Sequence, residues 1–189
     1  MRDLVTELVV VDIGGTHARF AIATIGADGA ISLDELETLH TADHASFQTA
    51  WEDFARMQGG SLPPAVSIAI AGPVGGDVIR FTNNPWVIRP AMVNKKLGVD
   101  AHVLVNDFEA VAYAVGACGE GAFQHICGPD VPLPDTGTIS VLGPGTGLGA
   151  AAIRRDARGL AVLETEGGHA SFAPHDEREI FILRFLQRR

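Results

Sequence analysis

Cysteine, basic residues and long apolar runs are all scarce in this sequence. The two cysteines, Cys118 and Cys127, are too few for a disulfide framework, and their spacing matches no metal-binding pattern. We expect reduced thiols with a packing role in a cytoplasmic protein. The 14 Lys and Arg against 23 Asp and Glu give a net charge of −9, which argues against nucleic acid or an anionic membrane as the main partner.

No stretch approaches the roughly 20 apolar residues that a membrane helix needs. The N-terminal MRDLVTELVVVDIGG has charges inside its short apolar run and no small-residue cleavage site, unlike a signal peptide. Hydrophobic residues nevertheless make up 47% of the chain, which is enough for a sizeable core and argues against disorder.

The first half of the chain is expected to form a mixed α/β sheet. Strands predicted over residues 7–15, 19–25 and 31–39 follow one another through short turns, so they should pair as antiparallel neighbours. Farther along the chain, strands alternate with helices, which predicts parallel pairing. These elements are strands over 65–71 and 101–105 and helices over 45–57, 91–97 and 108–117. A short strand over 77–81 is expected to pair with the strand at 65–71.

Residues 119–137 are rich in Gly, Pro and Asp, and we expect them to begin a second domain, so that the domains cover 1–118 and 119–189. Strands predicted over 138–142 and 147–154 then flank a glycine-rich loop. This repeats the strand–loop–strand layout at the start of the chain and hints at an internal duplication.

The end of the chain has an unusual predicted helix. Asp176 can act as its N-cap, with acidic residues in the first turn and Arg188 and Arg189 at the end. Its apolar side chains cover nearly the whole circumference, and such a helix needs neighbours on every side. We therefore expect the chain to be the front part of a longer protein.

The first cluster that can carry chemistry is Asp12-Ile13-Gly14-Gly15-Thr16. Paired glycines let the backbone approach a phosphate closely and point N–H groups at it, and Thr16 adds a hydroxyl. Asp12, at the strand end, can hold Mg²⁺ directly or through water. The alternative is an ordinary Gly-Gly hairpin.

A second phosphate loop is predicted at Gly143-Pro144-Gly145-Thr146-Gly147-Leu148-Gly149, which has more glycine than a turn needs. The residues expected to face the phosphates are Gly143, Gly145, Thr146 and Gly147. A purely structural turn remains the alternative.

Asn106-Asp107 ends a predicted strand at the start of a helix, where α/β proteins place ligands. Asp107 can be the general base that accepts a proton from an attacking hydroxyl, and Asn106 can hydrogen-bond the substrate. The alternative is that one of them caps the helix, whose N-terminus would stabilise the carboxylate and weaken it as a base. Phosphoryl transfer tolerates a weaker base because its transition state is loose.

Glu166-Gly167-Gly168-His169 could direct a carboxylate and an imidazole at one small polar ligand. The pair suits vicinal hydroxyls better than a metal, although His169 could also be purely structural. In the segment Thr82-Asn83-Asn84-Pro85-Trp86, we expect Trp86 in the core. A substrate contact by Asn83 or Asn84 stays open.

Together these segments resemble the ATP-dependent bacterial glucokinase family of proteobacterial type. The match runs from Val10 to Arg189 and includes VDIGGTHARF, IAIAGPVGGD, TNNPW, VNDFEAVAYA, GPGTGLG and EGGHASFAP, in family order and spacing. The resemblance implies the actin/hexokinase/Hsp70 superfamily. The fold would then be a ribonuclease-H-like (actin-like ATPase) mixed sheet of three antiparallel strands extended by βα units, plus the start of a second, similar domain.

The resemblance also implies the activity of a glucokinase, the first step of glycolysis. ATP with Mg²⁺ would phosphorylate the 6-hydroxyl of glucose, giving glucose 6-phosphate and ADP, in a full-length homodimer. Asp107 would be the base, and other sugar hydroxyls would contact Asn106, Glu166 and His169. The stretch from Asp12 through Ile13, Gly14 and Gly15 to Thr16 would be the first phosphate loop, and residues 143–149 the second. His17 departs from the Asn common in relatives, a change we expect to be tolerated.

Chains of this family continue well past Arg189, with a further sugar-binding Glu, an adenosine site and a terminal helix that returns to the first domain. We therefore expect these 189 residues alone to bind glucose weakly and to turn over negligibly.

Two other functions compete with the kinase. A sugar sensor related to repressor–kinase families would often carry an N-terminal DNA-binding domain and a Cys-rich zinc motif. The strand predicted from Glu7 and the two cysteines argue against it. An ATPase or actin-like scaffold is disfavoured by the sugar-binding set, while selectivity among hexoses rests on single hydroxyl contacts and stays open.

Overall fold

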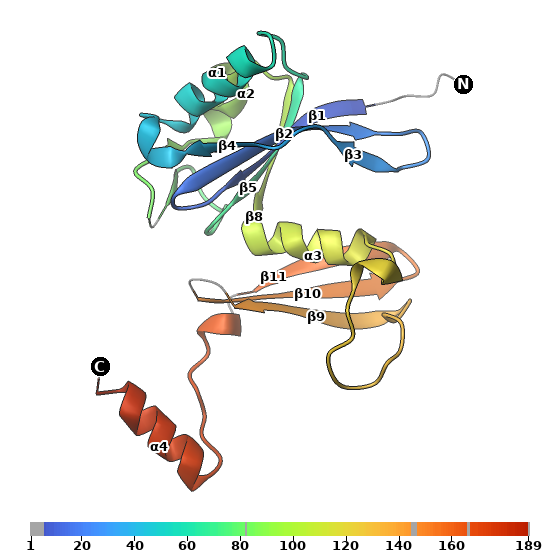
Figure 1. Cartoon of the computed structure of the whole chain (residues 1–189), viewed down its shortest axis with the longest axis vertical. Coiled ribbons are helices and arrows are strands. Elements are labelled where there is room, and N and C mark those ends of the chain that lie inside the picture. The colour runs from blue at the N-terminus through green and yellow to red at the C-terminus, as the bar shows by residue number, and fades with distance from the viewer. Residues whose placement is uncertain (1–5, 82, 145–146, 166, 189) are drawn as a thin grey trace. The chain divides into compact units, whose positions relative to one another are not determined.

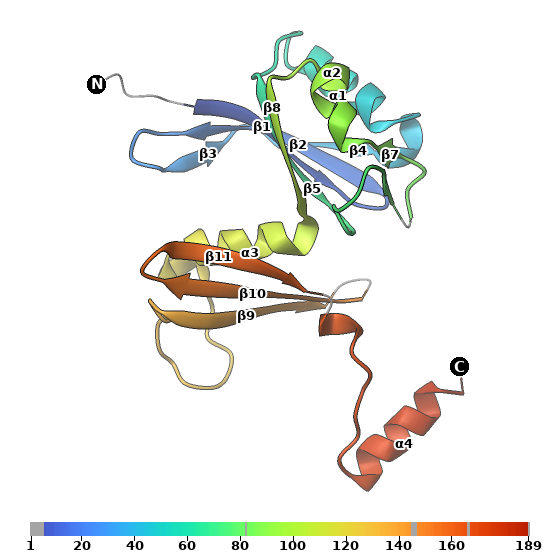
Figure 2. The ribbon, with the colours of Figure 1, turned by 180° about the vertical axis from the view of Figure 1, so that it is seen from behind.

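The computed structural model describes residues 6–81, 83–144, 147–165 and 167–188 (Figures 1 and 2). The chain divides into two compact units, Met1–Ala114 and Val115–Arg189, each with a sheet of its own. Within the described ranges, no helix has the length and apolar character needed to cross a membrane.

The first unit is built on a mixed sheet of six strands. They are β1 (Thr6–Ile13), β2 (His17–Ile25), β3 (Ile31–Leu33), β4 (Glu37–His40), β5 (Ala65–Ile70) and β8 (Ala101–Asn106). The order is β3-β2-β1-β5-β8, and β4 also pairs with β2. The first four strands pair antiparallel, whereas β1, β5 and β8 run parallel, which confirms the predicted mixture of pairings.

Two strand predictions need correction. The single strand expected over 31–39 is interrupted, so that β3 and β4 each pair with a different part of the long β2. The strand near 77–81 is β6 (Ile79–Arg80), which pairs with β7 (Val87–Ile88) and not with β5. Because β1 and β8 already occupy both sides of β5, no free edge is left there for β6.

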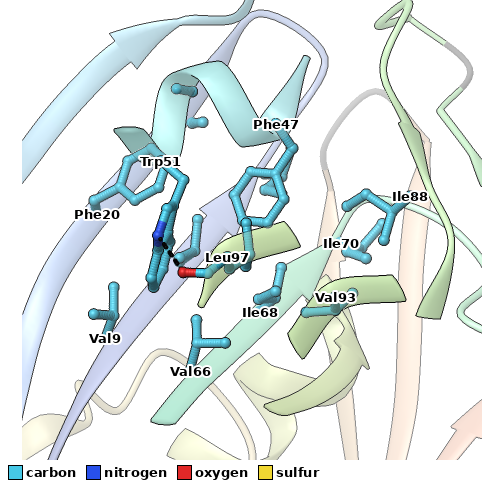
Figure 3. Packing of buried hydrophobic residues seen from close by; sticks show 14 of the residues in the cluster. Val9, Phe20, Phe47, Trp51, Val66, Ile68, Ile70, Ile88, Val93 and Leu97 are labelled. Carbon is cyan, nitrogen blue, oxygen red and sulfur yellow. Dashed lines mark hydrogen bonds between the residues drawn. The ribbon is translucent and has the colours of Figure 1, made fainter. Parts of the chain in front are cut away.

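Helices α1 (Phe47–Met57) and α2 (Val93–Leu97) complete the core of this unit (Figure 3). Ser46 caps α1 by accepting a hydrogen bond from Thr49 N, in a reciprocal capping box. The buried side chains of α1 recur at helical spacing and pack with those of β1, β2 and β5; on α1 they are Phe47, Ala50, Trp51 and Phe54. The Trp51 indole N–H donates to Leu97 O at 3.1 Å and ties the two helices together.

Trp86 lies in the core, as predicted. It is 1% exposed, and its indole N–H donates to His44 O at 2.9 Å. The short helical turns nearby are η1 (Thr41–Asp43) and η2 (Pro90–Met92). After β8 the chain enters α3 (Asp107–Ala117) without an intervening loop, as the strand–helix junction predicted.

The second unit contains a three-stranded antiparallel sheet in the order β11-β10-β9. Its elements are η3 (Glu120–Ala122), β9 (Gly137–Pro144), β10 (Leu148–Asp156), β11 (Gly159–Thr165), η4 (Gly167–His169) and α4 (Glu177–Leu186). The hairpin of β9 and β10 was predicted, but β11 was not. Cys118 and Cys127 are free and exposed, so their expected packing role is wrong, because both lie in irregular segments rather than in a core.

The last helix has the predicted cap. Asp176 Oδ1 accepts a hydrogen bond from Glu179 N at 2.8 Å. Several apolar side chains of α4 are exposed to solvent, with Phe181 70% exposed and Phe185 52% exposed.

Candidate active site

The first glycine loop joins β1 to β2 through a tight turn. Ile13 pairs with Ala18, and Gly14 N donates to His17 O at 2.9 Å to close the turn. Neither Gly14 nor Gly15 has a left-handed backbone. A Cβ on Gly15 would lie 3.0 Å from the Cβ of Asn83. Gly15 therefore lies in a tight contact with Asn83, and its backbone conformation does not itself call for glycine.

Asp12 is paired with its cross-strand neighbour. It lies opposite Arg19 in the β1–β2 register, and Arg19 Nη1 donates to Asp12 Oδ2 at 2.8 Å. Both side chains are about half exposed, at 47% each. Because an exposed ion pair contributes only about 0–1 kcal/mol, this one is easily rearranged by a ligand.

The register of the parallel strands brings two predicted clusters to one edge of the sheet. Ile13 is aligned with Ile70, and Ile70 with Asn106, so the three strands end in one row. Strand spacing of about 4.8 Å puts the end of β1 about 10 Å from the end of β8. The first glycine loop and Asp107 therefore leave the carboxyl edge of the same sheet, where α/β proteins bind ligands.

Asn106 caps α3. Its Oδ1 accepts hydrogen bonds from Phe108 N at 2.9 Å and Glu109 N at 3.2 Å, while Asn106 N donates to Glu109 Oε2 at 3.4 Å. Its Nδ2 donates to Gly72 O at 3.1 Å. The helix-cap alternative thus holds for Asn106, which also ties the start of α3 to the loop after β5.

Asp107 is the first residue of α3 and is partly buried. Its Oδ1 accepts a hydrogen bond from Phe108 N at 2.8 Å. One carboxylate oxygen is therefore oriented by the backbone at the helix N-terminus. The α/β junction presents the carboxylate from a rigid element and not from a loop, which suits a group that must meet a substrate hydroxyl in one geometry.

The second glycine loop is shorter than its sequence suggests. Gly143 pairs with Gly149 and Pro144 with Leu148, so these four residues belong to β9 and β10. Only residues 145–147 lie between the strands. Gly145 and Thr146 are outside the described residues, and Gly147 is exposed.

The Gly167–His169 turn is packed against the start of β10. A Cβ on Gly168 would lie 1.6 Å from Leu148 O and 2.7 Å from the Leu148 carbonyl carbon. No side chain fits there, so glycine at 168 allows η4 to approach the second loop. His169 ends this turn and is exposed, whereas Glu166 lies outside the described residues.

The structure thus gathers the predicted site residues in two places. In the first unit, Asp12 to Thr16, Asn106 and Asp107 share one sheet edge. In the second unit, His169 adjoins the second glycine loop through Gly168. The hydrogen bonds of Thr41 and Asn84 to the first loop were not predicted, because a contact between residues so far apart leaves no signal in local sequence pattern. For Asn84 the sequence left a substrate contact open.

The described residues contain no cluster of three or more His, Cys, Asp or Glu that could hold a metal ion. Magnesium bound beside phosphates does not need one, since it usually keeps several waters and uses one or two carboxylates with the substrate's oxygens. Asp12 at the strand end fits that limited role.

Comparison with known proteins identifies the family. The glucokinase family model matches residues 9–189. The glucokinase of Zymomonas mobilis is 54% identical over 183 residues, covering 97% of this chain and 56% of its own. That of Hahella chejuensis is 38% identical and covers 96% of this chain and 55% of its own.

Solved structures agree in fold. A glucokinase from an Antarctic psychrotroph has a TM-score of 0.81 at 31% identity and covers 96% of this chain and 56% of its own. The glucokinase of Balamuthia mandrillaris in complex with glucose has a TM-score of 0.72 at 23% identity, covers 97% of this chain and 54% of its own, and shows the fold alone. The chain thus spans about half the length of the curated relatives it matches. Over that half, the chain belongs to the bacterial glucokinase family.

Proposed function

We propose that the chain provides the phosphate-binding loops of an ATP-dependent glucokinase and the general base that deprotonates the sugar hydroxyl. The reaction is transfer of the γ-phosphoryl group of ATP to the 6-hydroxyl of glucose, giving glucose 6-phosphate and ADP. The observation that supports it most is the shared edge of β1, β5 and β8, which carries both a glycine loop and a helix-initiating carboxylate. Family membership supports the same reaction.

In this proposal Asp107 accepts the proton of the sugar 6-hydroxyl as that oxygen attacks the phosphorus in line. Its hydrogen bond from Phe108 N fixes one carboxylate oxygen. The phosphates lie on backbone N–H groups of the two glycine loops, so most of the acceleration comes from positioning and charge stabilisation. Mg²⁺, when bound with ATP, would neutralise phosphate charge, and Asp12 would hold it through water.

The proposed sugar contacts are Asn106, Asp107, Glu166 and His169. Asn106 can make such a contact without losing its present hydrogen bonds, because its amide has two N–H donors and only one of them bonds Gly72 O. The second can donate to a sugar hydroxyl while Oδ1 continues to cap α3.

We also propose a fold type, a domain division, a cellular compartment and an oligomeric state. The order of antiparallel and parallel strands in the first unit supports a ribonuclease-H-like (actin-like ATPase) fold, and the β9–β10 hairpin supports a second, similar domain. We propose a small domain over 1–118 and the start of a larger one over 119–189, in a cytoplasmic homodimer. The free thiols Cys118 and Cys127 suit a reducing compartment.

Substitution of Asn106 should separate its two roles. Asn106→Ser keeps a capping oxygen, whereas Asn106→Ala removes it, so the alanine variant should be about 0.5–2 kcal/mol less stable than the serine variant, while both lose the hydrogen bond to Gly72 O. Both variants lose the amide donor and should raise the KM for glucose by about 2- to 10-fold. Thermal unfolding and steady-state kinetics of the full-length protein measure the two effects. An unchanged KM for glucose in both variants would leave Asn106 as a cap alone.

The direct test of the reaction is ADP release from Mg-ATP by the full-length protein with glucose, mannose or fructose. We expect glucose-dependent turnover. Glucose binding without turnover on any of these sugars would favour the sugar sensor. A rate of ADP release that does not depend on added sugar would favour an ATPase.

A further inference from the structure

The first glycine loop is held by two residues that are distant in the sequence. Gly14 O accepts a hydrogen bond from Asn84 Nδ2 at 3.3 Å, and Gly15 O accepts one from Thr41 Oγ1 at 2.9 Å. Thr16 O accepts a third, from Thr41 N at 3.0 Å. Three consecutive loop carbonyls are thus each bonded to the framework of the first unit.

The two framework residues are themselves firmly anchored. Thr41 is 3% exposed and begins η1, directly after the strand β4 that pairs with β2. Asn84 is 6% exposed, and its Oδ1 accepts a hydrogen bond from Trp86 N at 2.9 Å. Trp86 is buried in the core and bonded to His44 O. Neither side chain can turn away without breaking buried hydrogen bonds, which is costly.

Because these carbonyls are fixed, the geometry of the peptide bond also fixes the direction of the loop's N–H groups. In a trans peptide the carbonyl and the following N–H point in opposite directions. With the Gly14 and Gly15 carbonyls bonded to the framework, the N–H groups of Gly15 and Thr16 point away from it. Within the described part of the chain no residue accepts a hydrogen bond from either N–H. Successive outward N–H groups form an anion-binding concavity.

We propose that Thr41 and Asn84 are positioning residues that aim the N–H groups of Gly15 and Thr16 at the phosphates of the nucleotide. This inference rests on the proposed function, because it assumes that the loop meets phosphate there. It gives Asn84 a role different from the substrate contact left open by the sequence. The hydrogen bond from Asn84 to Gly14 O also accounts for the short distance between Asn83 and Gly15.

The matched variants Thr41→Val and Thr41→Ser test the proposal in the full-length protein. Valine has nearly the same shape but no hydroxyl, whereas serine keeps the hydroxyl. Thr41→Val should lower kcat/KM for ATP about 3- to 10-fold and leave the KM for glucose within about twofold, and Thr41→Ser should stay close to wild type. Equal losses toward both substrates, or valine and serine variants that behave alike, would overturn it.

Binding of inorganic tripolyphosphate, measured by calorimetry, separates this inference from the kinase proposal. In one outcome the wild type shows no sugar-dependent turnover, yet Thr41→Val binds tripolyphosphate about 3- to 10-fold more weakly than the wild type. That outcome would refute the kinase and retain the positioning role. An active kinase whose tripolyphosphate affinity is unchanged in Thr41→Val would refute the positioning role alone, as would a wild type that binds no tripolyphosphate. If Thr41→Val fails to fold, Thr41→Ala compared with Thr41→Ser provides the same test.

Discussion

Replacing Asp107 by asparagine in the full-length protein is expected to lower kcat by about 10²- to 10⁴-fold, the range that a general base contributes. Asparagine keeps an oxygen that can accept the hydrogen bond from Phe108 N, so the start of α3 should stay intact. The variant loses the carboxylate that accepts the proton of the sugar hydroxyl. The KM for ATP should change little, because the loop at the end of β1 is untouched.

Glu109→Gln is the matched control. Glu109 lies in the same helical turn, and its Oε2 accepts a hydrogen bond from Asn106 N that the glutamine oxygen can keep. We expect its kcat to stay within about threefold of wild type, since only a weak hydrogen bond is altered. Equal losses in both variants, or an Asp107→Asn enzyme that keeps more than a tenth of wild-type kcat, would contradict the assignment of the base.

The second large effect is expected from Gly168→Ala. The added Cβ would lie 1.6 Å from Leu148 O, and a Cβ has no rotamer by which to escape. The Gly167–His169 turn must therefore move away from β10 and take His169 with it. A displacement of about 1 Å at a binding group can cost about 100-fold in activity, so we expect kcat/KM for glucose to fall by about that factor. Overpacking should also cost about 1–3 kcal/mol of stability.

Gly121→Ala provides the comparison within the same unit. A Cβ there meets nothing within 4 Å, and Gly121 does not have a left-handed backbone. Its kinetics and unfolding temperature should match those of the wild type. If Gly168→Ala behaves like Gly121→Ala, the close approach of η4 to β10 is not required for the site.

The sheet of the first unit could be predicted because its strands carry local signals. Leu8 to Val11 form an apolar run closed by glycines, and the strand that ends at Asn106 is followed at once by a helix. Strand partners are less predictable, since local pattern does not show which edges remain open. This is why β6 was assigned to the already enclosed β5.

The chemistry of the candidate site was predictable to the extent that it depends on residue type at a strand end. Asp107 at the start of α3 is an example. Long-range contacts were not predictable: Thr41 lies 26 residues from Gly15, and Asn84 lies 70 residues from Gly14. The same holds for Gly168, whose need for glycine comes from the carbonyl of Leu148 on a different element.

The measurement that tests the central claim most directly is the ³¹P NMR spectrum of the full-length protein's reaction with Mg-ATP and glucose. The proposed phosphoryl transfer predicts a phosphate monoester coupled to the two protons on carbon 6 of glucose, formed in equal amount to ADP, and formed about 10²- to 10⁴-fold more slowly with Asp107→Asn. Inorganic phosphate as the only new signal, or no change in ATP despite bound glucose, would contradict it.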